Sequence, residues 1–138
     1  MMKKIFNFKS IVSLLVLSGC IATTKVFGLP DSPTVISGSL GFDYSTRGEL
    51  TITTSSALSI VEWNSFSIDD SELTTITFSD SSSVILAHVT GESVSNILGT
   101  LQSNGGVYLV NPNGIIIGTN GIIDANSFLG STLDVLIW

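Results

Sequence analysis

The chain has 138 residues, of which 43% are hydrophobic and 12% charged, with a formal net charge of −6. This length suits one domain, and the negative charge excludes general electrostatic binding to a nucleic-acid backbone or an anionic membrane. Cys20 is the only cysteine, which excludes a disulfide within the chain.

The N-terminal segment has the pattern of a signal peptide. Residues 11–22 form an apolar core, which has the length of a signal-peptide core and is too short to span a membrane. The positively charged residues before this core are Lys3, Lys4 and Lys9. We therefore expect the chain to be exported.

Two maturation sites compete within this segment. Val26 and Gly28 stand at −3 and −1 relative to Leu29, so we expect cleavage before Leu29. The chain then divides into a signal peptide, residues 1–28, and a domain, residues 29–138. The alternative is lipidation at Cys20, because Leu-Ser-Gly-Cys at residues 17–20 resembles a bacterial lipobox. The Leu-Pro start of the domain favours the first site.

Cleavage before Leu29 changes the charge of the protein. Arg47 becomes the only Lys or Arg against all 11 acidic residues, which gives a formal charge of −10. This charge keeps a strand-rich chain soluble, and it leaves a negative surface that a basic receptor could recognise.

Short strands separated by polar turns are predicted along most of the domain. Residues 50–53 alternate apolar and polar side chains, which is typical of a half-buried strand. Turns are predicted at residues 69–71 and 79–82. The other strands predicted in this half are residues 34–36, 59–63, 66–68, 73–78 and 84–89.

One segment departs from this pattern. Val94, Ile97, Leu98 and Leu101 have the i, i+3, i+4, i+7 spacing of an amphipathic helix. Gly99 weakens helix formation, so we expect only a minor helical segment there.

Two β-branched apolar runs then flank the turn Asn111, Pro112, Asn113 and Gly114. Asn111 can accept a bond from the backbone two residues on, Pro112 presets φ, and Asn113 and Gly114 tolerate a left-handed backbone. Strands are also predicted at residues 115–117, 122–124 and 133–138. Strands this short fit a parallel β-solenoid of roughly five turns with about 20 residues each, but composition alone leaves a β-sandwich open.

No constellation of catalytic, metal-binding or cofactor-binding residues is evident. The carboxylates of Asp69, Asp70 and Glu72 lack the spacing of a calcium loop. His88 is the only histidine and has no second ligand nearby in the sequence. Trp63 and Phe66 could form a carbohydrate platform, but their apolar neighbours favour a place in the core. We therefore expect no enzymatic activity, metal or cofactor.

Five ordered blocks of the domain resemble the N-terminal secretion domain of filamentous-haemagglutinin-like exoproteins, the domain used in two-partner secretion. The fourth block contains Asn-Pro-Asn-Gly-Ile, preceded by Gly-Gly-Val-Tyr-Leu-Val. The blocks are residues 61–68, 83–91, 95–105, 105–115 and 131–135. The resemblance implies an all-β, right-handed parallel β-helix and decides between solenoid and sandwich.

The same resemblance implies a function. Such a domain directs a secreted adhesin to an outer-membrane transporter of a Gram-negative-type bacterium, and it performs no chemistry. Asn111, Pro112, Asn113, Gly114 and Ile115 would carry transporter recognition or early turn formation. The mature adhesin would be secreted or held at the outer-membrane surface, where a host-cell surface is a further partner.

The length of the chain departs from the family pattern, because such exoproteins continue for hundreds of residues. We therefore expect a truncated gene product, which includes the case of a non-functional fragment. The sequence also leaves open a small surface lipoprotein held by acylated Cys20 and a β-helical carbohydrate-active enzyme. The single Arg and the lack of Lys after residue 28 count against the enzyme.

Overall fold

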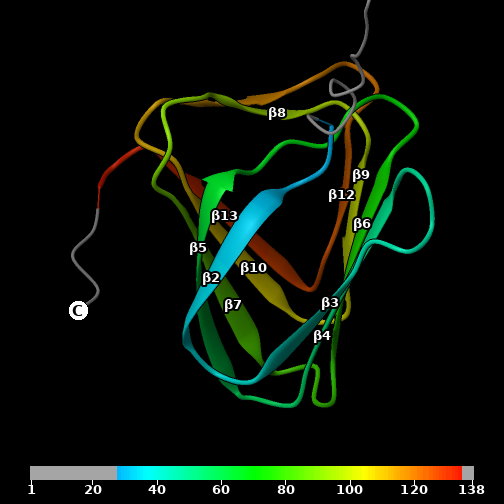
Figure 1. Cartoon of the computed structure of the whole chain (residues 1–138), viewed down its shortest axis with the longest axis vertical. Coiled ribbons are helices and arrows are strands. Elements are labelled where there is room, and N and C mark those ends of the chain that lie inside the picture. Colours follow the sequence, from blue (N-terminus) through cyan, green and yellow to red (C-terminus); the bar gives the residue numbers. More distant parts are fainter. Residues whose placement is uncertain (1–27, 135–138) are drawn as a thin grey trace, which may run out of the picture.

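The computed structural model describes residues 28–134, which wind into a β-helix of about four turns (Figure 1). Figure 1 shows two long walls of strands, with β8 crossing between them at one end of the view. No helix long and apolar enough to cross a membrane occurs in this part of the chain. The strands are β2 (Asp31–Ser37), β3 (Leu40–Asp43), β4 (Glu49–Thr54), β5 (Leu58–Ser65), β6 (Leu73–Phe78), β7 (Val84–Val89), β8 (Ser95–Ile97), β9 (Thr100–Ser103), β10 (Gly106–Val110), β11 (Ile115–Ile117), β12 (Ile122–Asp124) and β13 (Ser127–Ser131).

The strands form three sheets, one for each face of the β-helix. Two sheets have five strands, in the orders β13-β10-β7-β5-β2 and β12-β9-β6-β4-β3, and the third pairs β11 with β8. Strands of successive turns pair in parallel, whereas β2 and β3 pair antiparallel with β5 and β4 and cover the first turn.

The turns are longer and fewer than the sequence predicts. The register of one wall shows this, because Glu49 pairs with Leu73, Leu73 with Thr100, and Thr100 with Ile122. Each of these steps along the chain is longer than the expected turn, and the steps are unequal. About four turns therefore replace the expected five. The parallel β-helix itself is confirmed.

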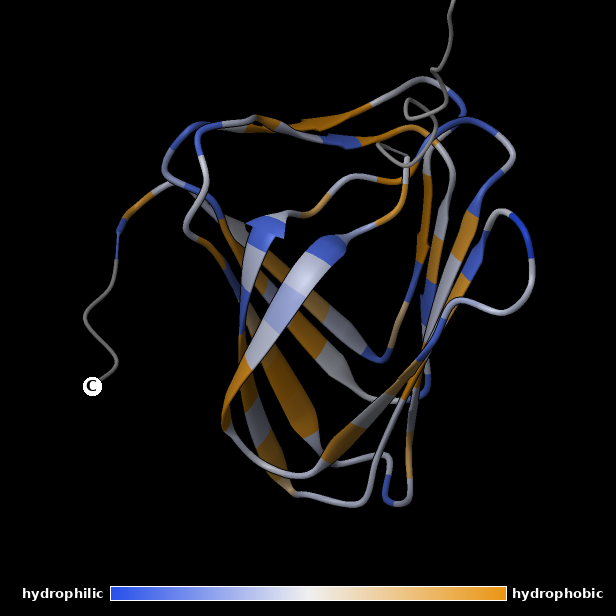
Figure 2. Ribbon diagram, in the orientation of Figure 1, coloured by the Kyte–Doolittle hydropathy of each residue, from blue (hydrophilic) through white to orange (hydrophobic). Residues whose placement is uncertain are grey.

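The core lies between the walls, where side chains of successive turns stack. Ile52 stands beside Ile76 in one wall, and Ile85 beside Val107 in the other. Trp63 and Phe66 are fully buried, with edge-to-face rings 5.4 Å apart, so the prediction that they fill the core is confirmed. Figure 2 shows hydrophobic residues recurring along the strands, while several loops are hydrophilic.

The minor helical segment predicted over Val94 to Leu101 is wrong, because this stretch forms β8, a corner and β9. Its buried positions alternate with period two, and Ile97 and Leu101 are both 0% exposed. Gly99 sits at the corner, where a Cβ would overlap the backbone carbonyls of Asp69 and Glu72. The i, i+3, i+4, i+7 spacing of apolar residues arises because two short strands, β8 and β9, are joined by a short corner.

Two further strands, β3 and β13, are present in the structure but are not predicted from the sequence. Both lack a run of consecutive β-branched residues. Leu133 and Asp134 lie outside any strand, although the sequence predicts a strand over residues 133–138. The rest of that segment and residues 1–27 of the expected signal peptide, which include Cys20, lie outside the described residues.

The stacking of turns predicts different costs for two isoleucines paired in one ladder. Ile97 is buried, whereas Ile117, its partner in the next turn, is 50% exposed. Ile97→Ala should lower the free energy of unfolding by about 2–5 kcal/mol, and Ile117→Ala by less than about 1 kcal/mol. Urea unfolding followed by circular dichroism measures both, and equal losses would contradict this stacking.

Candidate functional site

The segment from Asn111 to Ile115 forms the corner between β10 and β11. The Gly114 N–H donates to the Asn111 carbonyl over 3.0 Å, which closes a four-residue turn with Pro112 and Asn113 in the middle. Gly114 has a φ of 123°, a backbone region that disfavours side-chain-bearing residues. The predicted strand, turn and strand are all present.

Asn111 is fully buried and uses its whole amide group. Its Nδ2 donates to the Ser93 carbonyl and to Ser95 Oγ, both at 2.9 Å. Its Oδ1 accepts from the backbone N and from Nδ2 of Asn113, also at 2.9 Å each. An amide offers two donors and two acceptor sites, so its hydrogen-bonding capacity is filled.

The same residue joins three successive turns of the β-helix. Ser93 and Ser95 belong to the preceding turn, and the Asn111 backbone N donates to the Ser131 carbonyl of the following turn over 2.9 Å. Gly114 adds a further link, because its carbonyl accepts from the Ser95 N–H at 3.0 Å. The corner is thus a cross-link between turns as well as a change of direction.

Asn113 contributes to the corner through the hydrogen bonds of its side chain and not through a left-handed backbone. The sequence predicts a left-handed backbone as one reason for this residue, but the only described non-glycine residues with positive φ are Ser32 and Ser71. Instead Asn113 Nδ2 donates to the Gly91 carbonyl over 2.8 Å. This contact spans 22 residues, so no local sequence pattern indicates it.

The corner therefore presents two kinds of side chain. Pro112 and Asn113 are exposed, whereas Ile115 is partly buried against the core. None of the five side chains from Asn111 to Ile115 carries an ionisable group. The corner can bind through shape and hydrogen bonds, and it has no acid, base or nucleophile.

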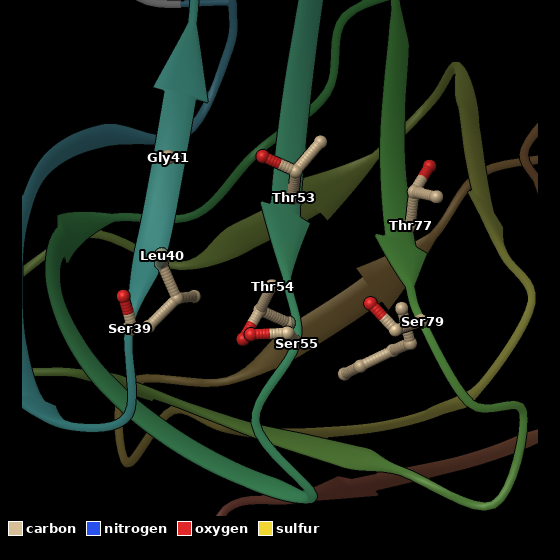
Figure 3. Close-up of a pocket in the computed structure, with 9 residues that line it drawn as sticks. Ser39, Leu40, Gly41, Thr53, Thr54, Ser55, Thr77 and Ser79 are labelled. Carbon is tan, nitrogen blue, oxygen red and sulfur yellow. The ribbon is translucent and has the colours of Figure 1, made fainter.

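Other candidate sites offer little chemistry. His88 points away from the core yet is nearly buried, with Nε2 3.1 Å from Asp134 Oδ1. A surface depression of about 480 Å³ between β3, β4 and β6 is lined mainly by Ser and Thr, without an ionisable side chain (Figure 3). Within residues 28–134, three or more potential ligands from His, Cys, Asp and Glu do not gather anywhere as a metal-binding group.

A family model described as the TPS secretion domain matches residues 33–137, which include the whole corner. The chain belongs to this family. Two similar proteins, both named heme/hemopexin-binding protein and both from Haemophilus influenzae, are 32% and 30% identical to it over 129 residues. The alignment covers 91% of this chain but only 14% of either relative.

The crystal structure of the HMW1 secretion domain from Haemophilus influenzae is similar as well. It is 33% identical, with a TM-score of 0.74, over 78% of this chain and 28% of that one. The family identified from the five sequence blocks is therefore confirmed, as is its β-helical fold.

Membership sets the general function. TPS exoproteins are secreted by Gram-negative bacteria and have an outer-membrane transporter as partner. The family is a secretion domain rather than a catalytic one. The chain is thus a TPS secretion domain homologous to those of HMW1 and the heme/hemopexin-binding proteins.

The bonds at the corner predict unequal roles for its two asparagines. Asn111→Ala should lower the free energy of unfolding by about 2–4 kcal/mol, because it removes four bonds and leaves buried partners unsatisfied. Asn113→Ala should cost about 1 kcal/mol, because its side chain is exposed. Urea unfolding measures both losses, with Asn120→Ala in an exposed turn as the control. A larger loss for Asn113→Ala would contradict this ranking.

Proposed function

We propose that residues 29–138 are the secretion-targeting module of a filamentous-haemagglutinin-like exoprotein, recognised by its outer-membrane transporter through residues 111–115. One observation supports this assignment most. The corner has buried bonds that fix its shape and two exposed side chains, Pro112 and Asn113, that a partner can contact. The module itself performs no chemistry.

The bonds of the corner divide into local and distant ones. The Gly114 N–H to Asn111 carbonyl bond and the Asn113 N–H to Asn111 Oδ1 bond both lie within the four-residue turn. Because these bonds need no neighbouring strand, the turn can form in an otherwise unfolded chain. A transporter that admits an unfolded chain can therefore meet this turn already shaped.

The distant bonds follow once the preceding turn of the β-helix is in place. They join Asn111 to Ser93 and Ser95, and Asn113 to Gly91. The same residues thus serve two successive steps. As a local turn they are recognised by the transporter, and after folding they cross-link successive turns of the β-helix. Solenoids stabilise each repeat through its neighbours, so this cross-link favours growth of the folded stack.

Export assays can separate recognition from stability. With the cognate transporter co-expressed, Asn113→Ala should reduce the secreted fraction several-fold, because the exposed amide is removed while the fold loses only about 1 kcal/mol. Ile97→Ala provides the control, since it destabilises the fold more but lies in β8, outside the corner. Quantitative blotting of culture medium and cells measures the secreted fraction.

Two outcomes would contradict the proposal. Export of Asn113→Ala at the wild-type level would remove the role of its amide. A stronger export defect for Ile97→Ala than for Asn113→Ala would show that export follows stability rather than the turn.

The mature N-terminus is a separate part of the proposal. We expect the exported protein to begin at Leu29, because Val26 and Gly28 suit the −3 and −1 positions, with Cys20 lipidation as the alternative. Intact mass spectrometry of the exported protein decides between the two. A mass that includes residues 20–28 and acyl chains would refute cleavage before Leu29.

A further inference from the structure

Gly28, the residue before the expected cleavage site, is buried against the side chain of Glu72. The Gly28 carbonyl accepts from the Asp69 N–H at 3.2 Å, and Glu72 Oε1 accepts from the same N–H at 2.9 Å. A Cβ on Gly28 would overlap both carboxylate oxygens of Glu72. The peptide bond between Gly28 and Leu29 therefore lies beside the carboxylate.

Glu72 shares its cleft with one cationic side chain, Arg47, and forms no ion pair with it. It lines a cleft of about 770 Å³ with Asp31, Tyr44 and Arg47, yet no Lys or Arg of residues 28–134 forms an ion pair with it. Burial raises the pKa of Glu72, and the neighbouring charge of Asp69 raises it further, against the lowering effect of the Asp69 N–H bond. The carboxylate is thus placed where a cation would stabilise it.

We propose that Glu72 binds the α-amino group that cleavage creates on Leu29. Hydrolysis adds the hydroxyl of water to the Gly28 carbonyl carbon and a hydrogen to the Leu29 nitrogen. That amine takes up a second proton near neutral pH, because the ordinary pKa of an α-amino group is about 7.7–8.0. The new Gly28 carboxylate leaves with the residues before it, and when the processed chain folds, the new ammonium faces Glu72. The inference rests on cleavage before Leu29.

The residues after the cleavage site hold the new terminus in place. The Leu29 side chain packs against the core, and the Pro30 carbonyl accepts from the Tyr44 hydroxyl at 2.7 Å. Asp31 begins β2 and pairs with Ser65 of β5. When the processed chain folds, these contacts therefore place the amine beside Glu72, without a search by a flexible tail.

Processing and folding are linked by this arrangement. The bond to be cut is buried in the folded domain, so a peptidase must cut it before this corner closes. Only the processed chain then closes the corner with a cation beside Glu72. The charged groups facing this site are Asp31, Arg47, Asp69 and the new ammonium.

The pH dependence follows from the sign of the linkage. An ion pair raises the pKa of the folded α-amino group above its unfolded value. While Glu72 is ionised, the contribution of this amine to stability is fully present below about pH 7.7 and is lost as the pH rises through the folded pKa of the amine. A group with only a structural role at this corner would not give this dependence.

A double-mutant cycle tests the inference on the chain that starts at Leu29 and runs to Trp138. The cycle combines a free or acetylated α-amino group with Glu72 or Glu72→Gln. Acetylation should lower the Tm by about 4–8 °C at pH 6.5, the shift expected for a loss near 1 kcal/mol. It should have little effect in Glu72→Gln and a full effect in the exposed control Asp70→Asn.

A second measurement needs only the wild-type chain. The pKa of the Leu29 α-amino group, from the pH dependence of its acylation rate, should lie above the ordinary range. An unshifted pKa would overturn the inference, as would equal effects of acetylation with Glu72 and with Gln at this position. An exported protein that begins elsewhere than Leu29 would overturn it too. The Tm and pKa readouts do not involve the transporter, so their failure is distinct from failure of the secretion proposal.

Discussion

Backbone pairing between successive turns is the interaction on which this structure depends. Each parallel strand of the two long walls finds its partner one full turn earlier or later along the chain. The inward side chains stack only because this pairing aligns them. Corners interrupt this pairing, and backbone N–H and C=O groups there lose the hydrogen-bond partners that a neighbouring strand would supply.

Asparagine side chains resolve that difficulty at several corners. The Asn104 amide accepts from the Phe78 N–H at 2.8 Å and donates to the Phe78 carbonyl at 2.9 Å, as a paired strand would. Asn126 Nδ2 donates to the carbonyls of Ser81 and Asn104. Asn111 follows the same rule between Ser93 and its own turn. One amide supplies both a donor and an acceptor, which explains why asparagine suits these places.

Most strands of the two walls could be predicted from the sequence, because the alternation of apolar and polar residues within each strand is a local pattern. The Asn-Pro-Asn-Gly turn could be predicted for the same reason, including the Asn111 bond two residues on. The segment around Ile97 could not, because a corner between two short strands imitates helical spacing. Strand β13 has few apolar residues, and its pairing with β10 makes it a strand. The Asn113 contact with Gly91 depends on turn lengths, which differ from one turn to the next.

The two corners for which we propose a function would act at different stages, because their bonds have different ranges. The turn at Asn111 is closed by bonds between its own residues, so part of its shape exists before any wall is built. The corner at Glu72 requires that β2 pairs with β5 and that residues 28–30 pack against the first turns of the β-helix. It therefore forms only when these turns are folded. A chain that crosses a membrane unfolded can therefore present the first corner to its transporter. The second corner, where we propose that the new terminus binds Glu72, can close only after the chain has begun to fold.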